Sequence, residues 1–215
     1  MKKILFLIPN LGHGGAERVL VNLVNNLPGN EYDVTVYVLF NEGINREYIN
    51  YNKVHYKYLF NMKMFRGYTQ IFKLFPKKFL YKRIVKDQYD IVVSYLEGST
   101  ARIISGCNNK NVKKISWIHI EQDNKKVFSH SFRSFIEAVE SYNSFDRIIC
   151  VSNTVKEDFI KISGIDSKKI DVVYNINETD QITEKSKEKV DDLCIDNNCI
   201  NICSVAKLMY TKGYD

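Results

Sequence analysis

The sequence lacks a hydrophobic run long enough to cross a membrane. Apolar stretches such as Ile4–Ile8 are about five residues long, whereas a spanning helix needs about 20. Lys2 and Lys3 precede this stretch, but it is too short for the core of a secretory signal, and no small-residue cleavage site follows. We therefore expect a cytoplasmic protein, either free or attached peripherally to the inner face of the cell membrane.

The cysteine pattern argues against two further classes of protein. The sequence has 5 cysteines, an odd number, and no two of them form a CxxC pair. A disulfide framework and a zinc site are therefore disfavoured, and Cys107 and Cys150 are expected to be small buried apolar residues in a reducing cytosol. The histidines His13, His55 and His130 have no ligand-like spacing. We expect no metal ion and no cofactor in this domain.

Two adjacent glycines, Gly14 and Gly15, stand between the apolar run Ile4–Ile8 and an amphipathic stretch over 16–27. The spacing predicts a strand, a glycine turn and a helix that Pro28-Gly29 ends. Such a turn lets the backbone approach an anion at the positive end of the helix. A dinucleotide fingerprint would need a third glycine where Glu17 stands, and a Walker motif is absent. The glycines alone equally fit a tight turn that binds nothing.

Strand-like and helix-like segments alternate along most of the chain. Further strands are predicted over 33–40, 53–59, 90–95, 112–119, 147–151 and 170–174. Nearly continuous apolar strands are typical of a parallel sheet covered on both faces, so the predicted fold is a doubly wound, mainly parallel α/β sheet. In such sheets ligands bind at the carboxyl ends of the strands. The loops expected to converge there are 10–15, 97–99, 119–121, 152–153 and the segment after Tyr174.

The composition changes near the end of the sequence. Residues 1–175 are predicted to form one domain, and the polar stretch 176–197 reads as a linker with a short helix over 186–193. The apolar stretch 200–206 predicts the first strand of another α/β unit within 198–215. We therefore expect one complete domain followed by the beginning of a second.

Four segments carry a family resemblance when they are taken in order. They are Ile-Pro-Asn-Leu-Gly-His-Gly-Gly-Ala-Glu-Arg over 8–18, Ile-Ile-Cys-Val-Ser-Asn over 148–153, Val-Val-Tyr-Asn over 172–175, and Ser-Val-Ala-Lys-Leu followed by Lys-Gly-Tyr-Asp within 204–215. This ordered set resembles retaining GT-B glycosyltransferases of family 4, which include many bacterial surface-polysaccharide enzymes. The resemblance implies a Rossmann-like acceptor domain and the start of a donor-binding domain, and hence a truncated enzyme that is inactive alone.

The resemblance also implies roles for individual residues. Gly14, Gly15, Lys207 and Lys212 are expected to bind the diphosphate of a nucleotide-sugar donor, with Lys207 in place of the family's usual Arg. His119 is expected at the transferred sugar as the catalytic residue. Glu17, Arg18, Glu97 and Glu121 are assigned to a saccharide or lipid-linked acceptor. The family's paired glutamates would lie beyond Asp215, and transfer is expected to retain the anomeric configuration without a protein nucleophile.

A basic segment over 57–86 contains no Asp or Glu, and aromatic residues are interleaved with its cations. This pattern is typical of a surface that binds anionic membranes, and Pro76 is expected to divide it into two short helices. The predicted membrane contacts are Lys73, Lys77, Lys78, Lys82 and Arg83. The same pattern fits aromatics packed on the sheet with merely solvated lysines. Nucleic acid is a weaker alternative because no binding module accompanies the charge.

Other functions remain open at this point. One is a non-catalytic module that binds an acceptor or a membrane and recruits a separate donor-binding subunit. A nucleotide-sugar epimerase is a further alternative within the same fold. A glycosidase is disfavoured, because acid pairs such as Glu121 and Asp123 that are near neighbours in sequence seldom reach the required separation.

Overall fold

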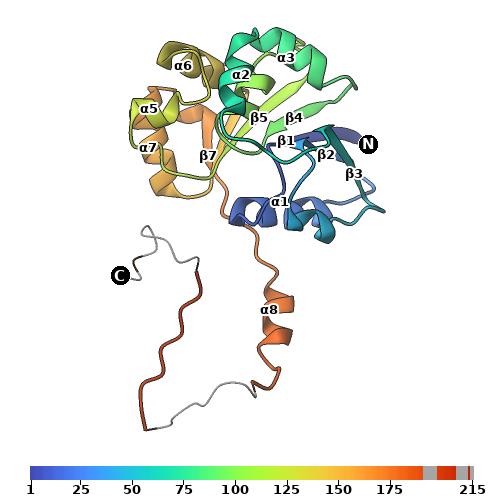
Figure 1. Cartoon of the computed structure of the whole chain (residues 1–215), viewed down its shortest axis with the longest axis vertical. Coiled ribbons are helices and arrows are strands. Elements are labelled where there is room, and N and C mark those ends of the chain that lie inside the picture. Colours follow the sequence, from blue (N-terminus) through green and yellow to red (C-terminus); the bar gives the residue numbers. More distant parts are fainter. Residues whose placement is uncertain (191–197, 207–212, 214–215) are drawn as a thin grey trace. The chain divides into compact units, whose positions relative to one another are not determined.

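The computed structural model describes residues 1–190, 198–206 and 213 (Figure 1). The chain divides into two compact units, Met1–Asn177 and Glu178–Asp215. Of the elements in the described residues, the first unit holds all seven strands and every helix except the last. Among the described residues, no helix is both long enough and apolar enough to cross a membrane.

The seven strands form one sheet in the order β3-β2-β1-β4-β5-β6-β7, and every neighbouring pair is parallel. Their bounds are β1 Lys2–Ile8, β2 Tyr32–Phe40, β3 Val54–Phe60, β4 Ile91–Ser94, β5 Lys113–Ile118, β6 Arg147–Cys150 and β7 Ile170–Val172. The chain runs outward from β1 to β3 and then crosses to β4, so the strand order reverses between β1 and β4. This confirms the predicted doubly wound α/β fold, and it places the topological switch point between these two strands.

The helices connect successive strands and cover both faces of the sheet. In the first unit they are α1 Gly15–Asn26, η1 Ile44–Tyr48, α2 Tyr68–Leu74, α3 Lys77–Ile84, α4 Ser99–Ile104, α5 Lys125–Phe128, α6 Phe135–Asn143, α7 Asn153–Ser163 and η2 Ser167–Lys169. The predicted break at Pro76 separates α2 from α3. The Ser152 hydroxyl caps α7 by accepting a hydrogen bond from the Val155 amide at 3.2 Å.

Two apolar clusters lie on opposite faces of the sheet. Ile4, Phe6 and Ile8 belong to the cluster that α1 covers, whereas Leu5 and Leu7 belong to the cluster that helices α2 to α7 cover. Successive side chains of a strand point to opposite faces, so β1 is buried on both. This explains why its sequence is continuously apolar rather than alternating.

The second unit differs from the expectation. Its helix, α8, spans Thr179–Lys185 instead of 186–193, and the predicted helix is not formed over 186–190. Asp180 in its first turn and Lys185 in its last suit the helix dipole. Residues 200–206 form no strand, and Ile200, Ile202 and Val205 are at least 90% exposed. A strand requires a neighbour for its backbone hydrogen bonds, and none of the seven strands pairs with this stretch.

Candidate functional site

The candidate site lies at the carboxyl edge of the sheet, where three of the loops expected to converge leave neighbouring strands. They follow β1, β4 and β5, which are adjacent in the strand order. The reversal of strand order between β1 and β4 is where open α/β sheets bind ligands. The predicted residues Gly14, Glu97 and His119 all belong to these loops.

The loop after β1 is fixed by side-chain hydrogen bonds. The carboxamide oxygen of Asn10 accepts a hydrogen bond from the Gly12 amide at 3.1 Å, and the Asn10 amide nitrogen donates to the Glu42 carboxylate at 2.7 Å. The Asn45 side chain donates to the Gly12 carbonyl. Asn10 is 9% exposed, so these bonds are shielded from water. These bonds hold the backbone at Gly12, two residues before the glycine turn.

The Glu17 carboxylate lies directly against the glycine turn. A Cβ added to Gly14 would be 1.9 Å from Glu17 Oε2, so the missing side chain leaves room for this carboxylate. Glu17 is in the first turn of α1, where the helix dipole stabilises a negative charge. The structure thus brings Gly14 and Glu17 together, with an acidic group already at the proposed diphosphate position. Arg18 points elsewhere, with its guanidinium carbon 4.0 Å from the centre of the Tyr48 ring.

Three rings form the second part of the site, where β4 and β5 end. The Tyr95 ring lies 5.1 Å from that of Trp117 and 4.8 Å from that of His119. Among the described residues, the buried side-chain nitrogen and oxygen atoms without a hydrogen-bond partner are Tyr95 Oη, Ser116 Oγ, Trp117 Nε1 and His119 Nε2. Ser116 lies within β5, and its side chain points to the opposite face of the sheet from that of Trp117. Buried polar groups are nearly always paired, so the three unpaired atoms of Tyr95, Trp117 and His119 make the ends of β4 and β5 a candidate ligand site.

The His119 imidazole is neutral and oriented. Burial lowers its pKa to about 4, and a hydrogen bond to the Tyr95 backbone carbonyl opposes this shift. Because Nε2 has no partner, the nitrogen that donates to the carbonyl is Nδ1. Nε2 then carries a lone pair and accepts hydrogen bonds. A sugar hydroxyl can donate to this atom, whereas a phosphate oxygen without a proton cannot.

Glu97 is positioned next to His119, as the converging loops lead one to expect. Its Oε2 accepts a hydrogen bond from the His119 amide at 3.1 Å. Burial raises the pKa of the Glu97 carboxyl, and the bond from His119 opposes that shift. The following residue, Gly98, has φ +87° and donates its amide to the buried Tyr142 hydroxyl at 3.1 Å. Glu97 thus connects the β4 and β5 loops rather than pointing freely toward an acceptor.

The remaining predicted residues are more dispersed. Glu121 is exposed in the loop after β5. Lys207 and Lys212 lie outside the described residues. Among the predicted membrane contacts, Lys78, Lys82 and Arg83 are exposed and Lys73 is half-buried. Lys77 instead donates to Ser141 Oγ on α6 at 3.0 Å, and burial lowers the pKa of its amine.

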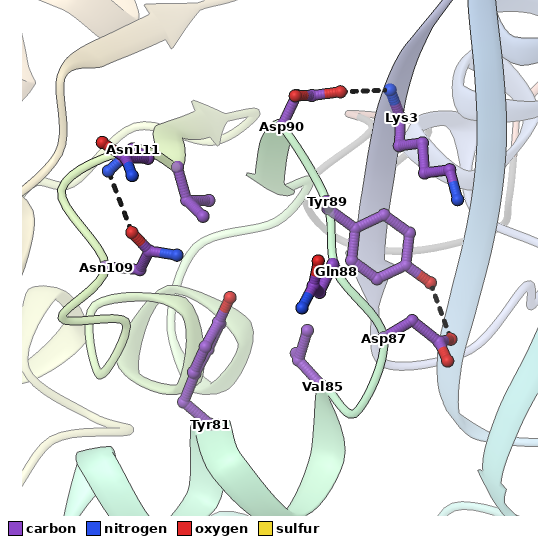
Figure 2. A pocket seen from close by; sticks show the side chains of 10 residues that line it. Lys3, Tyr81, Val85, Asp87, Gln88, Tyr89, Asp90, Asn109 and Asn111 are labelled. Carbon is purple, nitrogen blue, oxygen red and sulfur yellow. Dashed lines mark hydrogen bonds between the residues drawn. The ribbon is translucent and has the colours of Figure 1, made fainter.

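A cavity of about 520 Å³ lies at the opposite edge of the sheet (Figure 2). Lys3 and Asp90, which line it, stand at the amino ends of β1 and β4. Open α/β sheets bind their ligands at the carboxyl edge, so we do not assign the donor to this cavity. Within the part of the chain that the structure describes, no cluster of three or more His, Cys, Asp or Glu side chains could hold a metal ion.

The fold and the site define a Rossmann-like α/β domain with a ligand surface at its switch point. Residues 13–181 match the model of Glycosyltransferase Family 4, and the chain belongs to this family. No curated protein matches the sequence significantly.

Solved structures share the fold at low sequence identity. HepE of Anabaena, in complex with UDP and glucose, is similar with a TM-score of 0.56 and 16% identity over 87% of this chain and 50% of its own. A glycosyltransferase of Rickettsia africae has a TM-score of 0.53 and 17% identity over 88% and 50%. The lipopolysaccharide outer core galactosyltransferase WaaB has a TM-score of 0.53 and 19% identity over 81% and 46%. The chain spans about half the length of these structures.

Sequence reasoning missed Tyr95 and Trp117 as polar site residues. Both were assigned to strands, where aromatic residues usually belong to the core. Their shared orientation follows from the register, because Ser94 pairs with Ser116 and the next residues on the two strands are Tyr95 and Trp117. A signal was present, since Tyr95 stands two residues before Glu97 and Trp117 stands two residues before His119.

Proposed function

We propose that the chain is the acceptor-side part of a glycosyltransferase that moves a sugar from a nucleotide-diphosphate sugar to a saccharide or lipid-linked acceptor. The transfer would retain the anomeric configuration and would serve cell-surface polysaccharide synthesis. The observation that carries the proposal is the group of unpaired side-chain atoms of Tyr95, Trp117 and His119. They lie at the ends of β4 and β5, next in the sheet to β1, which the Gly14 turn follows. The chain that carries them belongs to Glycosyltransferase Family 4. HepE, which shares the fold, was crystallised with UDP and glucose.

The chemistry assigns two different tasks to the two parts of the site. The amides at the start of α1 suit the negative charge that develops on the leaving diphosphate, and Lys207 and Lys212 would add positive charge. His119 Nε2 would accept a hydrogen bond from a hydroxyl of the transferred sugar. Because the neutral imidazole adds no positive charge next to the reacting carbon, its contribution is orientation.

Glu17 has a specific place in this proposal. Its carboxylate lies where the diphosphate would approach Gly14, so donor binding requires the Glu17 side chain to move. Once displaced, the carboxylate is available to accept hydrogen bonds from acceptor hydroxyls. Arg18 and Glu121 would complete the acceptor side. Glu97 would act through His119, by holding the β5 loop.

A lipid-linked acceptor would be met at the inner face of the membrane. Lys73, Lys78, Lys82 and Arg83 would favour anionic headgroups there, and Lys77 would contribute less because it is bonded to α6. The alternative of a non-catalytic recruiting module remains compatible with this surface. The epimerase alternative is weaker, because the family model that matches the chain is a glycosyltransferase model.

The experiment that tests the proposal is release of nucleoside diphosphate from a panel of nucleotide-sugars with saccharide and lipid-linked acceptors. The 215-residue chain and a form extended by a donor-binding domain of about 150 residues would be compared. We expect turnover only from the extended form, with a product of retained configuration by NMR. Robust transfer by the 215-residue chain would contradict the division into two halves, and nucleotide-sugar epimerisation would favour the alternative enzyme.

A further inference from the structure

Helices α2 and α3 expose apolar side chains on their outer side. Ile71, Leu74, Phe75 and Phe79, here called the apolar ridge, are 46%, 75%, 41% and 47% exposed. The same two helices bury other apolar residues, Phe72, Leu80 and Ile84, against the sheet. The ridge is therefore additional to the core-facing stripe that a surface helix needs. An outer apolar surface on short helices indicates a binding partner.

The ridge is held in place from beneath by two arginines. Arg102, only 1% exposed, donates to the carbonyls of Phe72 at 2.8 Å and Phe75 at 2.9 Å. Arg133 donates to the next two carbonyls in the turn, those of residues 73 and 74, at 2.6 and 3.0 Å. These carbonyls lie at the end of α2, where helical hydrogen bonds run out; that of Phe72 also accepts from the Phe75 amide at 3.2 Å. The end of α2 is thus fixed to the body of the domain.

Glu137 on α6 completes this support. Its carboxylate pairs with the Arg102 guanidinium at 3.1 Å and accepts a hydrogen bond from the Arg133 amide. Burial of an arginine is costly unless its charge and its donors are used, and here the carboxylate and two carbonyls use them. The outward position of Leu74 and Phe75 is therefore built into the fold. Phe75 also stacks on Phe79, with ring centres 5.6 Å apart.

The surroundings of the ridge are positively charged. No Asp or Glu occurs between residues 57 and 86, and Lys78, Lys82 and Arg83 are exposed on α3. An apolar surface flanked by cations complements a membrane with anionic headgroups, because the side chains enter the acyl boundary while the cations stay at the headgroups. A neutral apolar partner would leave these charges without a complement.

We propose that the apolar ridge inserts into an anionic membrane surface and is the docking site of this domain. The inference rests on the proposed function in one respect, because it brings the acceptor edge of the sheet to the membrane. The Tyr68 hydroxyl, at the start of α2, lies 3.2 Å from Ser99 Oγ, directly after the Glu97-Gly98 turn. Helix α2 has 7 residues. At 1.5 Å per residue, the ridge at its other end lies about 10 Å from that edge.

The test is co-sedimentation of the full chain with vesicles of phosphatidylcholine alone and of phosphatidylcholine with phosphatidylglycerol. The double variant L74S/F75S and the triple variant K78Q/K82Q/R83Q would be compared with two matched controls on other surfaces, I44S and K126Q/K161Q/K168Q. Ile44 is 41% exposed, as Phe75 is, and the three control lysines are exposed. Wild type is expected to bind only the anionic vesicles.

Removal of each of the cations Lys78, Lys82 and Arg83 should weaken vesicle binding about five-fold at low salt. Loss of the two ridge side chains should weaken it at least about ten-fold at any salt concentration. In a separate F75W variant, tryptophan emission should shift to shorter wavelength with anionic vesicles, whereas I44W should not respond. Both controls should bind as wild type does.

Equal binding by L74S/F75S and wild type, or binding that ignores lipid charge, would overturn the proposal. So would a dimer that L74S/F75S dissociates without vesicle binding, since the ridge would then bind a second copy. The assay contains no donor or acceptor, so its failure leaves the proposed transfer untouched. Conversely, an extended form that lacks transfer to a water-soluble acceptor but binds vesicles would count against the proposed function alone.

Discussion

At the scale of single residues, the neutral state of His119 separates two roles that a histidine can have. A general acid or base works best with a pKa near the operating pH, whereas burial lowers the pKa of His119 to about 4. The Tyr95 carbonyl fixes Nδ1 as the donor, so Nε2 accepts. The low pKa of His119 and its accepting Nε2 thus favour orientation of a hydroxyl over proton transfer.

This assignment predicts a specific pH dependence. The imidazole should stay neutral down to about pH 5 and titrate near pH 4, which NMR of the ring protons in the intact chain would measure. Because the folded pKa lies below the unfolded value of about 6.5, the stability that neutral His119 allows is complete above pH 6.5 and is lost as the pH falls toward 4. The variant H119N should lack this loss. A ring that titrates near pH 6.5 would contradict the buried, oriented state.

The sequence was sufficient to place Glu97 and His119 in one site, but not to predict the hydrogen bond between them. Both follow apolar strands, and adjacent parallel strands end at the same edge, so their proximity could be predicted. The hydrogen bond from the His119 amide to Glu97 depends on the Gly98 turn, whose φ of +87° is stabilised by Tyr142 from a distant helix. Local patterns do not contain that contact. The direction of Tyr95 likewise depends on strand register.

At the scale of elements, the glycines of the candidate site differ in what they require. Gly43, which precedes η1, has φ +112°, and a Cβ there would lie 1.8 Å from the Leu11 carbonyl oxygen. Gly15, the first residue of α1, has no atom within 4 Å of an added Cβ. Gly43 can therefore lie against the β1 loop only because it has no side chain, whereas the space around Gly15 would admit one.

We accordingly predict opposite outcomes for two alanine substitutions. G43A should lower the free energy of unfolding by about 2 kcal/mol or more, because the backbone conformation is strained and the β1 loop must move. G15A, the matched control, should change it by less than about 0.5 kcal/mol or raise it slightly. Urea unfolding followed by circular dichroism measures both. Similar effects of the two substitutions would show that Gly43 does not position the loop.

Prediction of elements from the sequence succeeded where the core decides them and failed where it does not. The inner strands were recognised because burial on both faces makes them largely apolar, whereas the edge strands β3 and β7 each bury one residue. Helix α8 has no buried residue, so no apolar stripe marks it, and its position was missed. The stretch 200–206 has the composition of a strand, but composition cannot supply the neighbouring strand that a sheet needs.

At the scale of the whole molecule, the division at Asn177 separates a domain with its own core from a segment whose described residues form no core. Both apolar clusters lie within Met1–Asn177. Helix α8 buries no side chain, and the described residues 198–206 are exposed. Stability and docking should therefore belong to the first unit, whereas Lys207 and Lys212 of the proposed donor site belong to the second.

This division predicts the result of two truncations. A chain that ends at Asn177 should keep its free energy of unfolding within about 0.5 kcal/mol and should bind anionic vesicles as the full chain does. It retains the whole apolar ridge and, among the residues that the structure describes, every buried apolar one. A chain that ends at Lys169 also removes Ile170, which is 1% exposed in β7, and should lose at least about 2 kcal/mol. Thermal unfolding and co-sedimentation measure both effects. A loss of several kcal/mol in the chain that ends at Asn177 would show that residues 178–215 contribute to the folding of the first unit, and residues 1–177 could then not be treated as an independent domain.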